Sequence, residues 1–281
     1  MDNNLLDTLL KSFLREDIGR GDLTSESIFS PEDEGAARLV ARESFLVVGV
    51  ESVAARVFRL QNPAVLARSA VEDGRKVSPG DVLLTVSGPV IDLLKAERVA
   101  LNLLQRMSGI ATLTAQYVEE VKGYPVRICD TRKTTPGLRI LEKYAVVAGG
   151  GRNHRFNLTD GVLIKDNHIA ACGSVSKAVQ RVREKVPHTI RIEVETDLLS
   201  QVEECLSCGV DIIMLDNMSL AAMTEAVTLI DGKALVEASG GVTLDKLREI
   251  AKTGVDIISS GALTHSATAC DIGMDWLVSD G

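Results

Sequence analysis

The chain has 281 residues, of which 45% are hydrophobic, 25% charged and 3% aromatic, and its formal net charge is −8. This composition is ordinary for a globular protein and excludes collagen-like, coiled-coil and disordered chains. An acidic chain with few aromatic residues is poorly suited to binding a phosphate backbone or stacking bases, so we expect no nucleic-acid partner. No apolar run approaches the roughly 18 residues of a membrane span, and the acidic, amphipathic start does not resemble a secretion signal, so we expect no membrane partner either.

The first hundred residues predict a domain that mixes helices and strands. Helical patterns at 5–14 and 53–60 flank a strand-like segment at 37–50. Residues 73–90 then predict two short strands joined by a Ser-Pro-Gly turn. We therefore expect an α+β domain over residues 1–106.

An amphipathic helix is predicted next, from Ala96 to about Val121, with a break or kink near Ser108-Gly109. This helix carries the chain into a second domain, which we place at residues 107–265. We expect the C-terminal tail, residues 266–281, to return to the N-terminal domain.

The second half of the chain repeats an apolar run of strand length that ends abruptly in polar residues. Six such runs lie at residues 126–129, 161–164, 190–194, 211–215, 234–236 and 256–258. Continuous Val/Ile-rich runs are typical of parallel strands buried on both faces. The segment 208–217 also recurs at 253–262, a shift of about two strand–helix units. This regularity favours an α/β barrel, complete or short of eight strands, over a doubly wound open sheet, whose glycine fingerprint is absent.

The five cysteines are an odd number in a long chain, which is typical of reduced thiols in the cytoplasm. We therefore expect a cytoplasmic protein. Cys205 and Cys208 have CxxC spacing, but no second ligand pair for zinc follows, and the pair closes a predicted helix instead of opening one. We expect a structural role for this pair.

Basic residues are concentrated in one stretch of this acidic chain. Between Arg127 and Lys165 there are eight basic and three acidic residues, a net charge of +5, whereas the remaining residues carry −13. Glycines, threonines and His154 accompany the basic residues, which argues against a simple solvated loop. A local positive field of this kind suits a small anionic ligand.

In a parallel barrel the carboxyl ends of the strands meet at one mouth, so residues that follow each apolar run should face a common cavity. The successive ends supply Asp130–Lys133, Lys165–His168, Glu195, Asp216-Asn217, Ser239–Gly241 and Ser260–Ala262. Arginine and lysine bind carboxylates or phosphates, and the two acidic positions offer the oxygen ligands that Mg²⁺ prefers. Small residues allow backbone N–H groups to approach a phosphate. The pattern predicts a cavity for a phosphorylated, metal-chelating substrate together with a carboxylate-bearing one.

Several longer motifs resemble one known family. DTRKTTPGLRILEKYAV begins at Asp130, GGGRNHR at Gly149, VLIKDNHI at Val162 and IEVE at Ile192. IIMLDN follows at Ile212, EASGG at Glu237 and SGALTHS at Ser260. In this order they closely resemble nicotinate-nucleotide pyrophosphorylase (carboxylating), also called quinolinate phosphoribosyltransferase, and the likeness covers essentially the whole chain.

The resemblance implies an N-terminal α/β sandwich domain and an incomplete α/β barrel. It also implies a pentosyltransferase, a glycosyltransferase of NAD and pyridine nucleotide biosynthesis. Such an enzyme joins quinolinate to 5-phosphoribosyl-1-pyrophosphate (PRPP) with Mg²⁺ and releases nicotinate mononucleotide, pyrophosphate and CO₂. The implied assembly is a homodimer with a shared active site, or a hexamer.

The resemblance also assigns roles to individual residues. Arg132, His154, Arg155 and Lys165 would hold the quinolinate carboxylates, with Arg98 reaching in from a neighbouring subunit. Thr131 and Lys133 would place the substrates, and Glu195 and Asp216 would face the ribose and Mg²⁺, directly or through water. The 5′-phosphate would be bound by Ser239, Gly240, Gly241, Ser260, Gly261 and Ala262. Lys133, Glu195 and Asp216 are the expected catalytic residues.

The sequence leaves two alternatives open. A relative on the same scaffold could use nicotinate, or another small acid, without decarboxylation, but the number of carboxylate-binding residues favours a dicarboxylate. A non-catalytic binding module for a phosphorylated metabolite would not need two acidic residues beside the basic ones. An assay of CO₂ release with quinolinate against nicotinate tests the first alternative, and PRPP binding without turnover would support the second.

Overall fold

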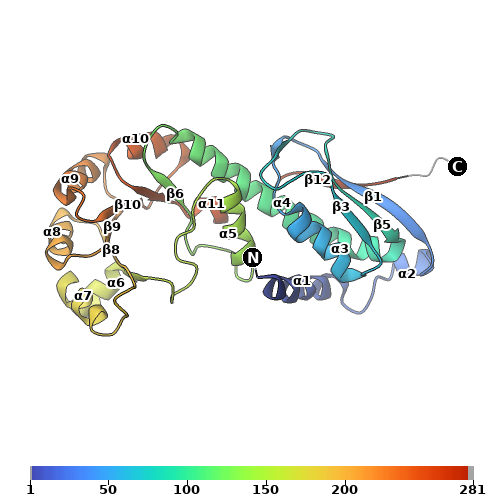
Figure 1. Ribbon diagram of the computed structural model, residues 1–281, viewed down its shortest axis with the longest axis horizontal. Helices are drawn as coiled ribbons and strands as arrows, with labels where there is room; N and C mark the ends of the chain where they lie inside the picture. The colour runs from blue at the N-terminus through green and yellow to red at the C-terminus, as the bar shows by residue number, and fades with distance from the viewer. Residues whose placement is uncertain (1, 278–281) are drawn as a thin grey trace. The chain divides into compact units, whose positions relative to one another are not determined.

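The computed structural model describes residues 2–277 and is shown in Figure 1. The chain divides into two compact units. The first comprises Met1–Leu113, Pro136–Gly149 and Ala267–Gly281, and the second comprises Thr114–Thr135 and Gly150–Ser266. Within residues 2–277, no helix has both the length and the apolar character to cross a membrane.

The sheet of the first unit is antiparallel and has the strand order β12-β1-β5-β3. Its strands are β1 (Glu34–Ala41), β3 (Leu66–Ser69), β5 (Val82–Pro89) and β12 (Ile272–Trp276). Along β1, Ala37 and Leu39 are buried while Arg38 is exposed, so one face of the sheet packs into a core. Strand β12, from the end of the described chain, pairs with β1 and places Met274 opposite Leu39.

Helices supply the rest of this core. They are α1 (Asn3–Ile18), α2 (Ser25–Ile28), the π-helix η1 (Val50–Ala55), α3 (Arg56–Gln61), α4 (Val90–Glu120) as far as Leu113, and α5 (Arg139–Ala148). A two-stranded pair, β2 (Phe45–Leu46) and β4 (Lys76–Val77), completes the unit. In α1, Leu6, Leu10 and Leu14 recur every four residues and are buried, as expected of an amphipathic helix.

The predicted strand at 37–50 is not continuous: its second half keeps only the short strand β2. Strand β1 ends at Ala41, and the chain turns at Gly49, whose φ is +97°, into η1. Asp73 stabilises this turn, because its Oδ1 accepts hydrogen bonds from the N–H groups of Gly49 and Val50 at 2.8 and 3.2 Å. The capping side chain lies more than 20 residues away in the sequence, so the local pattern did not indicate it.

The predicted break near Ser108-Gly109 is also wrong, since α4 is continuous from Val90 to Glu120. Gly109 has a different role: a Cβ at this position would overlap the backbone carbonyl of Thr268. The glycine therefore allows a close approach of the C-terminal segment to the helix.

The second unit contains a parallel six-stranded sheet with the order β6-β11-β10-β9-β8-β7. Its strands are β6 (Arg127–Cys129), β7 (Val162–Ile164), β8 (Ile192–Thr196), β9 (Ile212–Asp216), β10 (Leu235–Ser239) and β11 (Ile257–Ser259). The helices are α6 (Asp166–Cys172), α7 (Val175–Arg183), α8 (Leu199–Cys208), α9 (Leu220–Ile230), η2 (Leu244–Lys246), α10 (Leu247–Lys252) and α11 (Ala262–His265).

This sheet is an incomplete barrel. Strands β6 and β7 are its two edges, and Figure 1 shows α8, α9 and α10 following one another along the same side of the curved sheet. A doubly wound sheet would carry helices on both faces, so the predicted combination of an α/β sandwich domain and an incomplete barrel is confirmed.

The strands extend further than their apolar runs. Glu193 and Glu195 lie within β8, Asp216 ends β9, and Glu237 lies within β10. Parallel pairing continues through these polar residues, with Ser239 opposite Asp216. The concave face of an unclosed barrel leaves space for polar side chains, so the hydrogen-bonded ladder does not stop where the apolar residues stop.

Candidate active site

A cavity of about 480 Å³ lies within the second unit at the carboxyl ends of its strands. Most of the residues predicted for the site line it: Thr131, Arg132, Lys133, His154, Arg155, Lys165, Glu195, Asp216, Ser239, Gly240 and Gly241. Leu163, Met214, Asn217, Glu237 and Ser259 complete its lining. We call this space the upper cavity. It brings together side chains from segments that lie up to about 110 positions apart in the sequence.

The basic side chains of the upper cavity lie close enough to influence one another. Burial, and then the positive charge of Arg132, lower the pKa of Arg155, while the negative charge of Glu193 opposes this shift. Arg155 is held by a hydrogen bond from its Nη1 to the Gly161 carbonyl at 3.0 Å. Grouped cations that repel one another are stabilised by a bound anion.

Lys165 and Glu195 form an ion pair across neighbouring strands, with Lys165 Nζ 2.9 Å from Glu195 Oε2. The lysine side chain is 48% exposed and the glutamate side chain 14%, so the pair faces the cavity and not the core. His168 has a local structural role, because its Nδ1 accepts a hydrogen bond from Lys165 N at the start of α6.

Asp216 is positioned by the residue that follows it. Asn217 has a positive φ of 54°, and its Nδ2 donates to Asp216 Oδ2 at 2.8 Å. A Cβ on Gly240 would lie 2.7 Å from Asn217 Nδ2, so only glycine fits beside this amide. Gly240 and Gly241 both have positive φ, which exposes their backbone to the cavity.

The segment after β6 forms a tight turn beside α11. Lys133 N donates to Thr131 Oγ1 at 3.0 Å, and Thr264 Oγ1 donates to the Lys133 carbonyl at 2.7 Å. A Cβ on Gly261 would lie 2.7 Å from Lys133 Cδ, so this glycine makes room for the lysine side chain.

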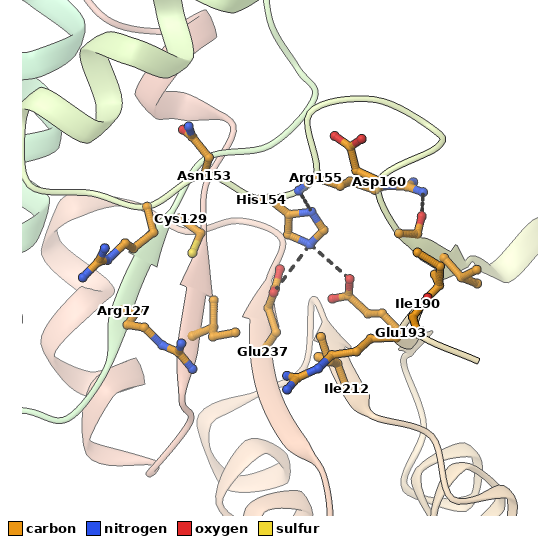
Figure 2. Close-up of a pocket in the computed structure, with 16 residues that line it drawn as sticks. Arg127, Cys129, Asn153, His154, Arg155, Asp160, Ile190, Glu193, Ile212 and Glu237 are labelled. Atoms are coloured by element: carbon orange, nitrogen blue, oxygen red, sulfur yellow. Dashed lines mark hydrogen bonds and ion pairs between the residues drawn. The ribbon is translucent and has the colours of Figure 1, made fainter. Parts of the chain in front are cut away.

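His154, Glu193 and Glu237 form a cluster that lines a second cavity (Figure 2), and His154 and Glu237 also line the upper cavity. His154 Nε2 is 3.1 Å from Glu193 Oε2 and 3.7 Å from Glu237 Oε2. Nδ1 of the same ring accepts a hydrogen bond from Arg155 N at 2.8 Å. Both ring nitrogens of His154 therefore face groups of the protein.

The second cavity, which we call the lower cavity, has a volume of about 660 Å³. Arg127, Arg152 and Arg191 contribute to its lining, together with the cluster. His154, Arg155 and Glu237 line both cavities, so the two spaces meet at the cluster.

Glu193 and Glu237 were not predicted as site residues, although they lie in the motifs IEVE and EASGG. The period of two along a strand could have found them, because Glu193 precedes Glu195 and Glu237 precedes Ser239 by two positions on the same face. Burial, followed by the negative charge of Glu193, raises the pKa of Glu237 to about 7.

Family models and known relatives agree on the kind of protein. Residues 22–108 match the N-terminal domain and residues 110–275 the C-terminal domain of quinolinate phosphoribosyl transferase. This chain belongs to the quinolinate phosphoribosyltransferase family. Proteins named probable nicotinate-nucleotide pyrophosphorylase [carboxylating] are 46% identical in Synechocystis, over 96% of this chain and 92% of that protein, and 45% identical in Bacillus subtilis, over 100% and 96%. The crystal structure of NadC from Streptococcus pyogenes is 43% identical, covers 99% of each chain and has a TM-score of 0.93.

Four residues predicted for the site lie outside the lining of the upper cavity. Ser260 is 4% exposed, and its Oγ accepts a hydrogen bond from Ala262 N at 3.3 Å, while Gly261 contacts Lys133 as described. Arg98 lies on α4 in the first unit and is exposed between buried Ala96 and Val99. Their predicted roles with phosphate and with a neighbouring subunit stay predictions.

The donor set of the upper cavity fits a divalent cation. Glu195 and Asp216 present carboxylate oxygens to one space, and hard oxygen donors suit Mg²⁺. The Lys165 ammonium group occupies the position beside Glu195 that a cation would also favour.

The cysteines differ in their surroundings, and none forms a disulfide within residues 2–277. Cys205 is buried in α8, and burial raises the pKa of its thiol to about 12. A thiol of this kind is not a nucleophile at neutral pH, which supports a structural role for Cys205.

Proposed function

We propose that this protein transfers the phosphoribosyl group of PRPP to quinolinate with loss of CO₂. The products are nicotinate mononucleotide and pyrophosphate, and the reaction belongs to NAD biosynthesis. One observation carries the proposal: in a chain of this family, Arg132, Arg155 and Lys165 share a cavity with Glu195 and Asp216. Such a cavity has separate basic and acidic sides for a diacid and a sugar phosphate.

The basic side binds the two carboxylates. Arginine provides a planar pair of donors for a carboxylate, and Lys165 adds a point charge. When Lys165 moves from Glu195 to the substrate, Glu195 becomes available to the ribose. Holding the ring nitrogen close to the anomeric carbon supplies much of the rate acceleration, because it makes a bimolecular step effectively unimolecular.

Lys133 and the glycines act on the phosphate groups. We assign Lys133 to the pyrophosphate leaving group, and Ser239, Gly240 and Gly241 to the 5′-phosphate, whose oxygens accept hydrogen bonds from exposed backbone N–H groups. Ser260, Gly261 and Ala262 would support this loop and the Lys133 side chain.

The acidic side of the cavity stabilises the positive charge that develops during the reaction. When pyrophosphate leaves, positive charge forms on the ribose, and the carboxylates of Glu195 and Asp216 stabilise it. The ring nitrogen becomes quaternary after it attacks the anomeric carbon. The pyridinium ring then accepts the electron pair of the adjacent C–CO₂⁻ bond as CO₂ departs, and a proton replaces CO₂ on that carbon. Glu195 and Asp216 would also hold Mg²⁺, directly or through water, which when bound would neutralise phosphate charge.

We extend the proposal to assembly and location. The exposed Arg98 would complete the diacid site of a second copy, which makes the protein a homodimer with shared sites, or a hexamer built from such dimers. The cysteines form no disulfide within residues 2–277, which suits the cytoplasm, where thiols stay reduced.

A direct assay tests the reaction. Purified protein with PRPP, Mg²⁺ and carboxyl-labelled quinolinate should release labelled CO₂ and nicotinate mononucleotide in equal amounts. Nicotinate in place of quinolinate should give no nucleotide. Nucleotide formation from nicotinate, or PRPP binding without turnover in calorimetry, would contradict the proposal.

A further inference from the structure

Glu237 is the most enclosed acidic group at the floor of the upper cavity. Its side chain is 2% exposed, and that of Glu193 is 5% exposed. Within residues 2–277, the Oε1 atoms of both glutamates are buried without a hydrogen-bond partner. An ionised carboxylate in this position lacks the donors that would offset its desolvation.

The hydrogen bonds of the cluster show that one donor is missing. Because His154 Nδ1 accepts from Arg155 N, the neutral ring carries its hydrogen on Nε2. That single N–H lies within hydrogen-bond distance of Glu193, at 3.1 Å, and beyond it from Glu237, at 3.7 Å. The Ser259 hydroxyl is the other donor beside Glu237, so two buried carboxylates still share one ring N–H, and a proton on Glu237 removes the mismatch.

We propose that Glu237 is a neutral carboxylic acid in the diacid site and that the site accepts quinolinate only while Glu237 holds its proton. The inference rests on the proposed function and deepens it. Glu237 lines the same cavity as Arg132, Arg155 and Lys165, so its negative charge would oppose a dianion at this place. The lower cavity, which Glu237 also lines, lets the proton exchange with solvent.

The groups that face Glu237 decide the direction of the pH effect. Glu193 from β8 and His154 from the loop before β7 are its titratable neighbours. At the level of Glu237, β9 contributes Met214 and β11 contributes Ile257, while Ser259 adds a hydroxyl. Burial and Glu193 together raise the pKa of Glu237 to about 7, so its proton is lost between pH 6 and pH 8. Quinolinate carboxyl groups are ionised throughout this range.

The wild-type enzyme should therefore bind quinolinate more weakly as the pH rises. Linkage to one proton predicts that KM for quinolinate increases about tenfold from pH 6 to pH 8. In Glu237→Gln the neutral amide cannot ionise, and this KM ratio should fall below about twofold. In Glu193→Gln a charge that holds the proton on Glu237 is gone, so the KM increase should begin at lower pH. Glu203→Gln, which removes an exposed charge on α8, should keep the wild-type ratio.

The outcomes separate this inference from the proposed function. A tenfold KM ratio that persists in Glu237→Gln would assign the titration to His154 and overturn the inference, while wild-type turnover still supports the function. If wild-type protein makes no nicotinate mononucleotide, the proposed function fails instead.

Proton uptake gives a test that needs no variant. Calorimetry of wild-type protein with quinolinate at pH 7, in two buffers of different ionisation enthalpy, should show uptake of about half a proton per site. Binding without uptake at this pH would overturn the inference even if Glu237→Gln does not fold.

Discussion

Asn217 connects two parts of the candidate site at the scale of single residues. Its positive φ turns the chain at the end of β9, its amide donates to Asp216, and the same amide fills the space where residue 240 would carry a Cβ. Glycine, asparagine and aspartate adopt this conformation more readily than other residues, and Asp231 also does so here. The Asn217 side chain at the end of β9 therefore requires a glycine at position 240, in the turn after β10.

Gly240→Ala tests this dependence. We expect the variant to lose about 1 kcal/mol of unfolding free energy because of its positive φ, and about 1–3 kcal/mol more because the methyl group meets the Asn217 amide. Gly232→Ala is the matched control, since Gly232 has a φ of +71° and no atom within 4 Å of an added Cβ. Urea denaturation measures both variants. Equal losses would contradict the contact, and Asn217→Gly in the Gly240→Ala background should recover the excess.

Lys133 is the second residue for which the structure suggests a sharp test. Its backbone is fixed by Thr131 and Thr264, while its side chain extends past Gly261. Lys133→Ala should lower kcat at least about a hundredfold, because an electrostatic contact to the leaving group is lost, with little change in unfolding free energy. Steady-state assays and urea denaturation measure the two effects. A near-normal kcat would refute the assignment to pyrophosphate.

At the scale of elements, the strands of the incomplete barrel carry chemistry on alternate positions. Glu193 and Glu195 point from β8 into the concave face, as do Glu237 and Ser239 from β10, so one strand serves both the buried cluster and the open mouth. In helix α4, by contrast, Gly109 has a packing role, because it leaves room for the Thr268 carbonyl.

Gly109→Ala should destabilise the protein although alanine is the better helix former. In an unobstructed helix the change would add about 1 kcal/mol of unfolding free energy. Here the methyl group overlaps the Thr268 carbonyl, so we expect a loss of more than about 2 kcal/mol in urea denaturation. Asn102→Ala, at an exposed position of the same helix, should be neutral or slightly stabilising. A stabilised Gly109→Ala variant would show that the C-terminal segment does not pack against α4.

At the scale of the whole molecule, the residues predicted for the site come from both units. All the residues that line the upper cavity belong to the second unit, while Arg98 belongs to the first. The net charge of −8 does not show the local positive charge of the cavity, because the basic side chains come from a single stretch of the chain. Association with a second copy is the proposed way to bring Arg98 to a cavity.

Mixed oligomers test this sharing. Arg98→Ala and Lys165→Ala should each be nearly inactive, because each removes a cation from the diacid site. After unfolding and refolding together in equal amounts, random dimers should recover about a quarter of wild-type activity, since half of the dimers contain one intact site. Mixing without refolding is the control. No recovery in the refolded mixture would contradict a site shared between subunits.

The sequence by itself determined the parallel strands, the family and most of the residues that line the upper cavity. These features are local: apolar runs define strands, and the polar residues at their ends occupy one mouth because parallel strands share a direction. The continuity of α4 was not predictable, because Gly109 is required by the close approach of the Thr268 carbonyl and not by a kink. The turn into η1 was not predictable either, because it depends on a hydrogen bond to the distant Asp73 side chain. Only the tertiary structure placed Glu237 beside Glu193 and His154, since burial and the sharing of one N–H depend on side chains that come from three separate segments.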